Sequence, residues 1–440
     1  MGRRSKLLKN AQDRLAENYL LRLLLIYFSF YALASYLSFF VNSYFEIRPL
    51  STLSFLIQDG WCNSAIQGIG EHCFGDFYYT LKFVNESNPW SAGPNPYPPF
   101  ALLLFKPFSF LVSKYPESNV GLILYLIVML ISFLIVPVYL VLRKKISKSI
   151  GFALSILLLT ATPTVIVLDR GNSIFLCVPL LFFFLKELSS KNETRAVLCL
   201  LLMVLIKPHL ILLGILFIRK GNIVQGLSKN IFLLIGFLFS FTFYGSLALS
   251  NIVDYSKQIL GYQEYADLGQ IFPVNISISN TAQLVANQVF GINLNSTTLK
   301  FILLSSCLSV IWYVYNHFKT DNLQCLISVV LLPMIVPNVS FHYYLILIVT
   351  LLVFVMYKTL ISVESSSESS CGYNFHSRSS LNIKIFIFII LSFVPWQIPM
   401  RFFTNSTDSE ISFHWILVSI YLVFLMIPTN LLHKFSARKS

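Results

Sequence analysis

Long apolar stretches recur along nearly the whole 440-residue chain, and they constrain its fold more than any other feature. A helix needs about 20 mostly apolar residues to cross the hydrocarbon core of a bilayer. Stretches of this kind include residues 19–41, 120–142, 231–249 and 383–398. Membrane-spanning strands would instead show segments of about ten residues with alternating hydrophobicity. The pattern therefore predicts an all-α polytopic membrane protein.

Composition and charge agree with this prediction. Only 12% of the residues are charged, whereas a soluble globular protein carries roughly 25%. The net charge of +13 does not indicate nucleic-acid binding, because the basic residues lie in short loops between apolar stretches, as in cytoplasmic loops of membrane proteins. The basic start is followed by an apolar run without a small-residue cleavage site, which predicts an uncleaved first span and a cytoplasmic N-terminus.

The alternation of apolar stretches and basic loops predicts about twelve spans with both termini in the cytoplasm. We expect one transmembrane domain over residues 1–440, without a separate soluble domain. Its long connections are a first exterior loop over residues 42–118, a second exterior loop over residues 251–299, and a flexible, serine-rich cytoplasmic loop over residues 359–382.

Two stretches are expected to enter the membrane region without forming an ordinary span. Residues 100–113 are too few to cross a membrane comfortably. A full crossing by this stretch would also place the basic residues 143–145 outside, so the stretch is predicted to form an interfacial or re-entrant helix. Residues 196–218 have basic residues at both ends and Lys207 at their centre, which predicts two half-spans meeting at Lys207. Broken helices at membrane depth are tolerated where they face protein or a wet cavity.

The seven cysteines indicate no metal site. Four of them lie within apolar runs and are expected to be ordinary core residues. Cys62 and Cys73 share the first exterior loop, and the sequence leaves open whether they form a disulfide. No metal-ligand cluster and no glycine-rich phosphate-binding motif occurs, so we expect neither a metal ion nor a nucleotide cofactor.

Ionisable residues near the exterior face are the candidate functional residues, because charge in a membrane is costly and is retained for function. Cations at this boundary suit an anionic group such as a lipid phosphate. Among the candidates Asp76 is the carboxylate best placed for acid–base chemistry. The set comprises Asp76, Lys106, Arg170, Lys207, His209 and His342.

Most of these candidates have a structural alternative that the sequence leaves open. Lys106 could extend its ammonium group to the membrane interface without binding a ligand. Arg170 could pair with neighbouring Asp169 at a helix end. Asp76 could cap the helix that follows it, and His342 could belong to an aromatic belt at the interface.

Several motifs occur in an order that resembles a known family. The first exterior loop, with Gly75–Tyr79, Asn88–Trp90 and Asn95–Phe100, is similar to that of GT-C glycosyltransferases of the GT87 type. The resemblance extends over about residues 20–345, and Gly171-Asn172 stands where members often carry Gly-Gln. Later segments that fit in order are Arg170–Ser173, Lys207-Pro208, Asn275–Ile278 and Pro337–Tyr343.

The resemblance implies a GT-C fold and an inverting transfer of a sugar, a hexose such as mannose. The absence of a metal-ligand cluster in the sequence predicts that the transfer is independent of metal. The donor would be a polyprenyl-phosphate sugar, and the acceptor a glycolipid or glycan outside the cytoplasmic membrane. Membrane lipid would be the remaining partner, with no nucleic acid and no cofactor, and we expect a monomer. The resemblance implies that Asp76 is the general base. His342 is a second catalytic candidate, and the sequence leaves open whether it contacts the phosphate or an acceptor hydroxyl. Donor-phosphate binding is expected for Arg170, Lys207, His209 and Lys106, and acceptor or sugar binding for Tyr97, Asn172 and Asn275.

The chemistry is consistent with these roles. A glycosidase needs two carboxyl groups, because its alkoxide leaving group must be protonated. A departing phosphate is already a stable anion, so one base suffices and cations stabilise the developing charge. A secondary transporter also has broken helices and intramembrane cations but usually shows matched repeats, and no second copy of the pattern over residues 76–107 occurs. A lipid-linked glycan ligase or flippase is the other alternative, although ligases normally place their large loop late in the chain.

Overall fold

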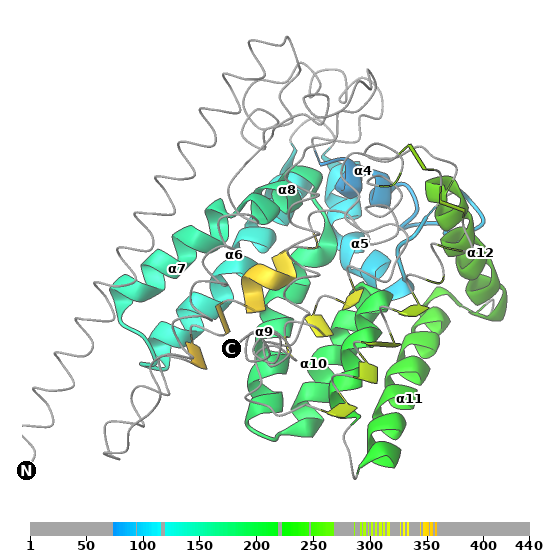
Figure 1. The fold of residues 1–440 in the computed structure, drawn as a ribbon. Helices are drawn as coiled ribbons and strands as arrows, with labels where there is room; N and C mark the ends of the chain where they lie inside the picture. Colours follow the sequence, from blue (N-terminus) through cyan, green and yellow to red (C-terminus); the bar gives the residue numbers. More distant parts are fainter. Residues whose placement is uncertain are drawn as a thin grey trace, which may run out of the picture.

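The computed structural model describes residues 74–267, except 94, 116–118, 219–221 and 246–247, together with scattered positions between 286 and 358. Every regular element within these residues is a helix, as predicted, and no strand occurs among them (Figure 1). Several predicted features lie outside the described residues: the first span, Cys62, Cys73, Asn275, His342, the loop over residues 359–382 and the last two spans.

The helices follow one another closely, and their ends agree with the predicted segments in several places. Helix α6 has the limits of the predicted second span, and α5 contains the predicted interfacial helix. The elements are α4 (Gly75–Leu81), α5 (Pro99–Lys114), α6 (Val120–Leu142), α7 (Lys148–Thr160), α8 (Thr162–Arg170), η1 (Ser173–Leu176), α9 (Cys177–Ser189), α10 (Glu193–Ile206), η2 (Pro208–Phe217), α11 (Ile223–Phe239), η3 (Ser240–Tyr244) and α12 (Ala248–Asp267).

Within the described residues, two helical stretches are long and apolar enough to cross a membrane, Val120–Leu142 and Ile223–Tyr244. Fewer than half of the residues of either stretch are buried. On α6, large apolar side chains at a spacing of four residues are exposed along one face: Ile123, Ile127, Ile131 and Ile135. Residues four apart lie on the same side of a helix, and soluble proteins rarely expose a long apolar stripe. This surface is suited to association with a membrane.

The predicted third span, residues 150–168, is divided into α7 and α8. The division lies at Ala161, where the backbone is extended with ψ 131°. Pro163 explains it, because a proline inside a continuous helix removes one hydrogen bond and its ring clashes with the carbonyl four residues earlier. With a new helix starting at Thr162, Pro163 lies in the first turn, where it is tolerated.

The break predicted at Lys207 is confirmed. Helix α10 ends at Ile206 and η2 begins at Pro208, while Lys207 itself is extended with φ −139° and ψ 95°. A residue before proline is disfavoured in the helical region, so Pro208 accounts for the position of the break. The first residues of the predicted second exterior loop are also helical, since α12 continues to Asp267.

An aromatic core holds α4 against the helices below it. The Tyr125 ring of α6 lies 4.6 Å from the Phe77 ring of α4, 5.2 Å from the Phe105 ring of α5 and 5.5 Å from the Phe175 ring of η1, centroid to centroid. All four side chains are buried. Buried aromatic rings contribute large apolar areas and prefer such tilted and edge-to-face contacts, so the short helix α4 has a fixed position.

Candidate functional site

Asp76 and Arg170 form a paired contact between α4 and the end of α8. The Arg170 guanidinium donates from Nη2 to Oδ1 of Asp76 at 2.7 Å and from Nε to Oδ2 at 3.1 Å. Asn172 donates from Nδ2 to Oδ2 at 2.6 Å. The two charged side chains are only 14% and 15% exposed. Helix α4 begins after Phe74, so Asp76 is not its capping residue, and its carboxylate is directed to Arg170 and Asn172.

The turn after α8 places Arg170 and Asn172 beside Asp76. Gly171 has φ +63°, and a Cβ atom there would lie 2.8 Å from Cβ of Phe77. Glycine is therefore needed for both the conformation and the close approach to α4. The Tyr125 hydroxyl donates to the Gly171 carbonyl at 2.9 Å, which fixes this turn.

A second hydrogen bond sets the orientation of the Asn172 amide. Its Oδ1 accepts from the backbone N–H of Ile174 at 3.0 Å, at the start of η1. Because the oxygen of the amide is used there, its Nδ2 faces Asp76 and can donate. The same Nδ2 lies 3.3 Å from the Tyr97 hydroxyl oxygen, so Tyr97 joins the group.

The carboxylate of Asp76 is held in its ionised form. Burial by itself would raise its pKa, but the charge of Arg170, the hydrogen bonds from Arg170 and Asn172, and the charge of Lys207 together lower the pKa below the ordinary value. A carboxylate has about four acceptor positions. Among the described residues three donors reach it, two at Oδ2 and one at Oδ1. Oδ1 therefore retains a position for another donor.

Lys207 brings a further positive charge to this group. It is 7% exposed, and its Nζ lies 4.6 Å from the centroid of the Tyr97 ring. Such cation–π contacts strengthen where water is excluded. In the described part of the chain, no carboxylate forms an ion pair with Lys207. We refer to Asp76, Arg170, Asn172, Tyr97 and Lys207 as the Asp76 cluster.

His209 lies beside the Asp76 cluster, two residues after Lys207. Its ring meets the Tyr344 ring edge-on at a centroid distance of 4.8 Å. The contact shows that the later half of the chain reaches this site. Tyr344 follows the predicted residue His342 by two positions, while His342 itself and Asn275 are outside the described residues.

Lys106 is the described candidate that the structure does not bring to the cluster. Its Nζ instead lies 5.2 Å from the ring centroid of Tyr244 in η3. Successive side chains on a helix point about 100° apart, and the neighbouring Phe105 occupies the aromatic core below Asp76. Lys106 is therefore directed toward a different surface of α5.

Three buried polar atoms near the cluster have no hydrogen-bond partner among the described residues: Nδ2 of Asn95, Oγ of Ser173 and Nε2 of His209. Asn95 precedes Tyr97 by two residues, and Ser173 follows Asn172. Buried polar atoms are nearly always satisfied, so exceptions require an explanation such as water or a ligand. The hydrogen-bonding groups of a polar ligand would satisfy them.

The described residues contain no group of three or more His, Cys, Asp or Glu side chains suited to hold a metal ion. The cluster instead combines one ionised carboxylate with two cations, which suits an anionic ligand beside a hydroxyl group. The sequence missed the role of Tyr125. It gave no signal for that role, because Tyr125 is one aromatic residue within an apolar run.

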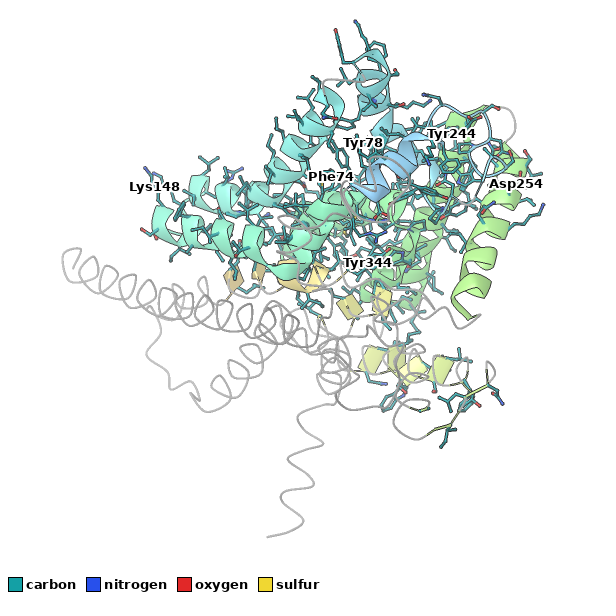
Figure 2. The ribbon with its side chains drawn as sticks, turned by 90° about the horizontal axis from the view of Figure 1, so that it is seen from above. Phe74, Tyr78, Lys148, Tyr244, Asp254 and Tyr344 are labelled. Carbon is teal, nitrogen blue, oxygen red and sulfur yellow. The ribbon has the colours of Figure 1, made fainter. Side chains whose placement is uncertain are left out.

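Figure 2 shows how the labelled residues are distributed around this site. Phe74 and Tyr78 mark α4, with Tyr244 and Asp254 to one side, whereas Lys148, at the start of α7, lies on the opposite side, at the edge of the described part of the chain. No protein-family model matches the chain, and no curated protein or solved structure matches it. A proposal for its function therefore rests on the residues of the chain itself.

Proposed function

We propose that this protein is an integral membrane glycosyltransferase of the GT-C type. It moves a sugar, a hexose such as mannose, from a polyprenyl-phosphate donor to a glycolipid or glycan acceptor, with inversion at the anomeric carbon. The observation that carries the proposal is the geometry of Asp76. No described residue besides Arg170 donates to Oδ1 of its ionised carboxylate, which leaves an acceptor position there. Next to it is a buried cation, Lys207, that lacks an ion-pair partner within the same described residues.

The charges of the cluster favour a donor with one phosphate group. Asp76 and Arg170 balance each other, which leaves the positive charge of Lys207. A buried charge is costly unless a counter-charge accompanies it. A sugar linked to a lipid through a single phosphate is a phosphodiester with one negative charge, so its binding would neutralise the cluster.

In the proposed reaction the acceptor hydroxyl donates to Oδ1 of Asp76 and its oxygen attacks the anomeric carbon. The bond from that carbon to the phosphate oxygen breaks, and the lipid phosphate leaves with the bonding electrons. The low pKa of Asp76 makes it a weak base, so it takes the proton after bonding to carbon has made the hydroxyl acidic. Lys207 stabilises the charge on the departing phosphate.

Within this proposal the residues around the cluster divide into two groups. Arg170 and Asn172 orient the carboxylate that serves the acceptor. Lys207 and His209 face the donor phosphate, and the buried atoms of Asn95 and Ser173 provide hydrogen bonds for sugar hydroxyls. Two arginine donors already reach Asp76, so Arg170 acts on the donor mainly through the electrostatic balance of the cluster.

The proposal places the Asp76 cluster on the exterior side of a multi-span protein whose termini are cytoplasmic. Two apolar helical stretches support membrane association. The basic turn between α6 and α7, where Lys148 lies, is distant from α4 (Figure 2). Basic residues mark the cytoplasmic ends of spans, which supports opposite sides for this turn and for Asp76. About twelve spans are expected by the same rule.

The decisive experiment is a transfer assay of the purified full-length protein with a panel of polyprenyl-phosphate sugars and glycolipid acceptors. Transfer from at least one monophosphate-linked donor, abolished by Asp76→Asn, would support the proposal. Glu193→Gln is a matched control, because it removes a carboxylate from an ion pair with Lys229 elsewhere in the protein. Absence of transfer from all donors, or uptake of the lipid-linked sugar without transfer, would contradict it and favour a transporter or flippase.

A further inference from the structure

Trp90 lies at the centre of a second buried group, next to the Asp76 cluster. Its side chain is 1% exposed, and its ring centroid lies 5.2 Å from that of Phe241, 5.5 Å from that of Tyr244 and 5.9 Å from that of Tyr255. A buried indole N–H needs an acceptor. Here Nε1 donates to the backbone carbonyl of Tyr97 at 2.9 Å.

Helix α12 holds the turn that carries Trp90. Gln258 donates from Nε2 to the Trp90 carbonyl at 2.9 Å, and Asn88 donates from Nδ2 to Oδ2 of Asp254 at 2.9 Å. Oδ1 of Asn88 also accepts from the Trp90 backbone N–H at 3.2 Å. Residues 254 and 258 are four apart and share one face of the helix, so this face of α12 is attached to the turn at two points.

Tyr97 connects this attachment to the chemistry. Its hydroxyl oxygen accepts from Asn172, and its ring lies below the ammonium group of Lys207. Pro98 follows it, which restricts Tyr97 to extended backbone conformations. With the carbonyl held by Trp90 and the backbone restricted, the indole fixes the backbone position from which the Tyr97 side chain extends.

We propose that Trp90 is a positioning residue of the Asp76 cluster and that α12 is the element that holds it in place. Its indole N–H fixes the Tyr97 carbonyl, and Tyr97 in turn places its hydroxyl against Asn172 and its ring against Lys207. The consequence for turnover rests on the proposed function. The consequence for the conformation of residues 95–97 does not, and it can be measured without any substrate.

The test compares two conservative variants within the same aromatic group. Trp90→Phe keeps a ring among Phe241 and Tyr255 but removes the donor to the Tyr97 carbonyl. Tyr244→Phe alters the same aromatic group by a single hydroxyl, which is buried without a hydrogen-bond partner among the described residues. It therefore breaks no hydrogen bond there, and it removes less volume than Trp90→Phe. Gln258→Met is a third variant, which removes the attachment to α12 and retains the length of the side chain.

The first measurement is amide hydrogen exchange of the full-length protein in lipid nanodiscs. Loss of the hydrogen bond to the Tyr97 carbonyl should loosen residues 95–97 and speed exchange of the Asn95 and Tyr97 amides by about tenfold in Trp90→Phe. Pro96 between them has no amide hydrogen. Gln258→Met should speed exchange to a smaller degree, and Tyr244→Phe should leave it unchanged. Unchanged exchange in Trp90→Phe, or the same change in Tyr244→Phe, would overturn the inference whether or not the protein is a transferase.

The second measurement is a double-mutant cycle on kcat/KM with Tyr97→Phe. If Trp90 acts through Tyr97, Trp90→Phe should lower kcat/KM by about tenfold in the wild type and by much less when Tyr97 is already Phe. Equal effects in both backgrounds would assign Trp90 a structural role alone and overturn the inference. A wild-type protein without transfer activity would contradict the proposed function instead, and the exchange measurement would then decide the inference.

Discussion

Arg170 donates hydrogen bonds to both carboxylate oxygens of Asp76, although the two residues are 94 positions apart in the sequence. The contact connects the first turn of α4 with the last turn of α8, and Asn172 completes it from the other side of Gly171. This contact keeps a buried carboxyl group charged, because Arg170 lowers the pKa of Asp76 against the effect of burial. The first predictions concern that charge.

Asp76→Asn should lower transfer activity by roughly 10²–10⁴-fold, the range typical of a lost general base. The amide has the shape of the carboxylate but takes up no proton from the acceptor. Turnover with a saturating lipid-phosphate donor is the measurement. Asp76→Asn also leaves Arg170 without its counter-charge, so Asp76→Glu is made as well, which keeps the charge. Full activity in a folded Asp76→Asn protein would exclude the general-base role.

The stability that Asp76 contributes should depend on pH in a defined direction. Its folded-state pKa lies below the ordinary value of 3.8. The ionised form is therefore favoured by folding, and its contribution is fully present above the ordinary value and lost as the pH falls through the lower folded value. Thermal unfolding of wild type and Asp76→Asn between pH 7 and 3 tests this. The difference in melting temperature should be constant down to about pH 4 and then decrease, and a difference that grows on acidification would contradict it.

Arg170→Gln should move the acid limb of the kcat/KM profile to higher pH. Burial alone raises the pKa of Asp76, and the strongest opposing effect comes from Arg170. Removal of the guanidinium leaves the effect of burial dominant, so the carboxylate takes up a proton at higher pH than in the wild type. Arg170→Lys retains a charge but not the paired geometry, so its acid limb should lie between those of the wild type and Arg170→Gln. An acid limb that stays in place in Arg170→Gln would show that another residue controls Asp76.

Sequence reasoning located much of the site because its residues occur in short polar motifs within an apolar chain. Asp76, Tyr97, Arg170, Asn172 and Lys207 were all candidates, and the structure brings these five together. The break at Lys207 was also predictable, since Pro208 follows it between two apolar stretches. Features of this kind depend on a few neighbouring residues, so each can be recognised within a single segment of the sequence.

Features that depend on the packing of distant segments were not predictable. The partner of Asp76 is one of these, because a single sequence does not show which cation 94 residues away will face it. The direction of Lys106 is another, since it depends on which face of α5 packs against α6. The division of the third span at Ala161 was not predicted, because that span was assigned from its continuous hydrophobicity and the effect of Pro163 on the helix was not considered.

Gly171→Ala should destabilise the protein by about 1–3 kcal/mol. Alanine would be strained at φ +63°, and its Cβ would contact Cβ of Phe77 at 2.8 Å. Gly291→Ala is the control, because Gly291 has the same φ of +63°, but no atom of the described residues lies within 4 Å of its added Cβ. Thermal unfolding should therefore show a larger decrease in melting temperature for Gly171→Ala than for the control. Equal decreases would mean that α4 can move away from the turn.

Lys207→Met should separate binding from stability. In the absence of a donor, Lys207 is a buried cation that has no ion pair with any carboxylate of the described residues, and replacing a buried charge by an apolar side chain of similar length is often neutral or stabilising. The melting temperature should stay the same or rise. Donor affinity should fall by about tenfold or more, since a charge-assisted contact with phosphate contributes roughly 1.5–3 kcal/mol.

The two effects of Lys207→Met are informative because they have opposite signs. A residue needed only for packing would lower stability and binding together. A residue retained for an anionic ligand costs stability in the free protein and restores it when the ligand binds, so the donor should stabilise the wild type but not Lys207→Met. Thermal unfolding with and without a lipid-phosphate sugar measures this. Equal stabilisation of both proteins by the donor would place the phosphate away from Lys207.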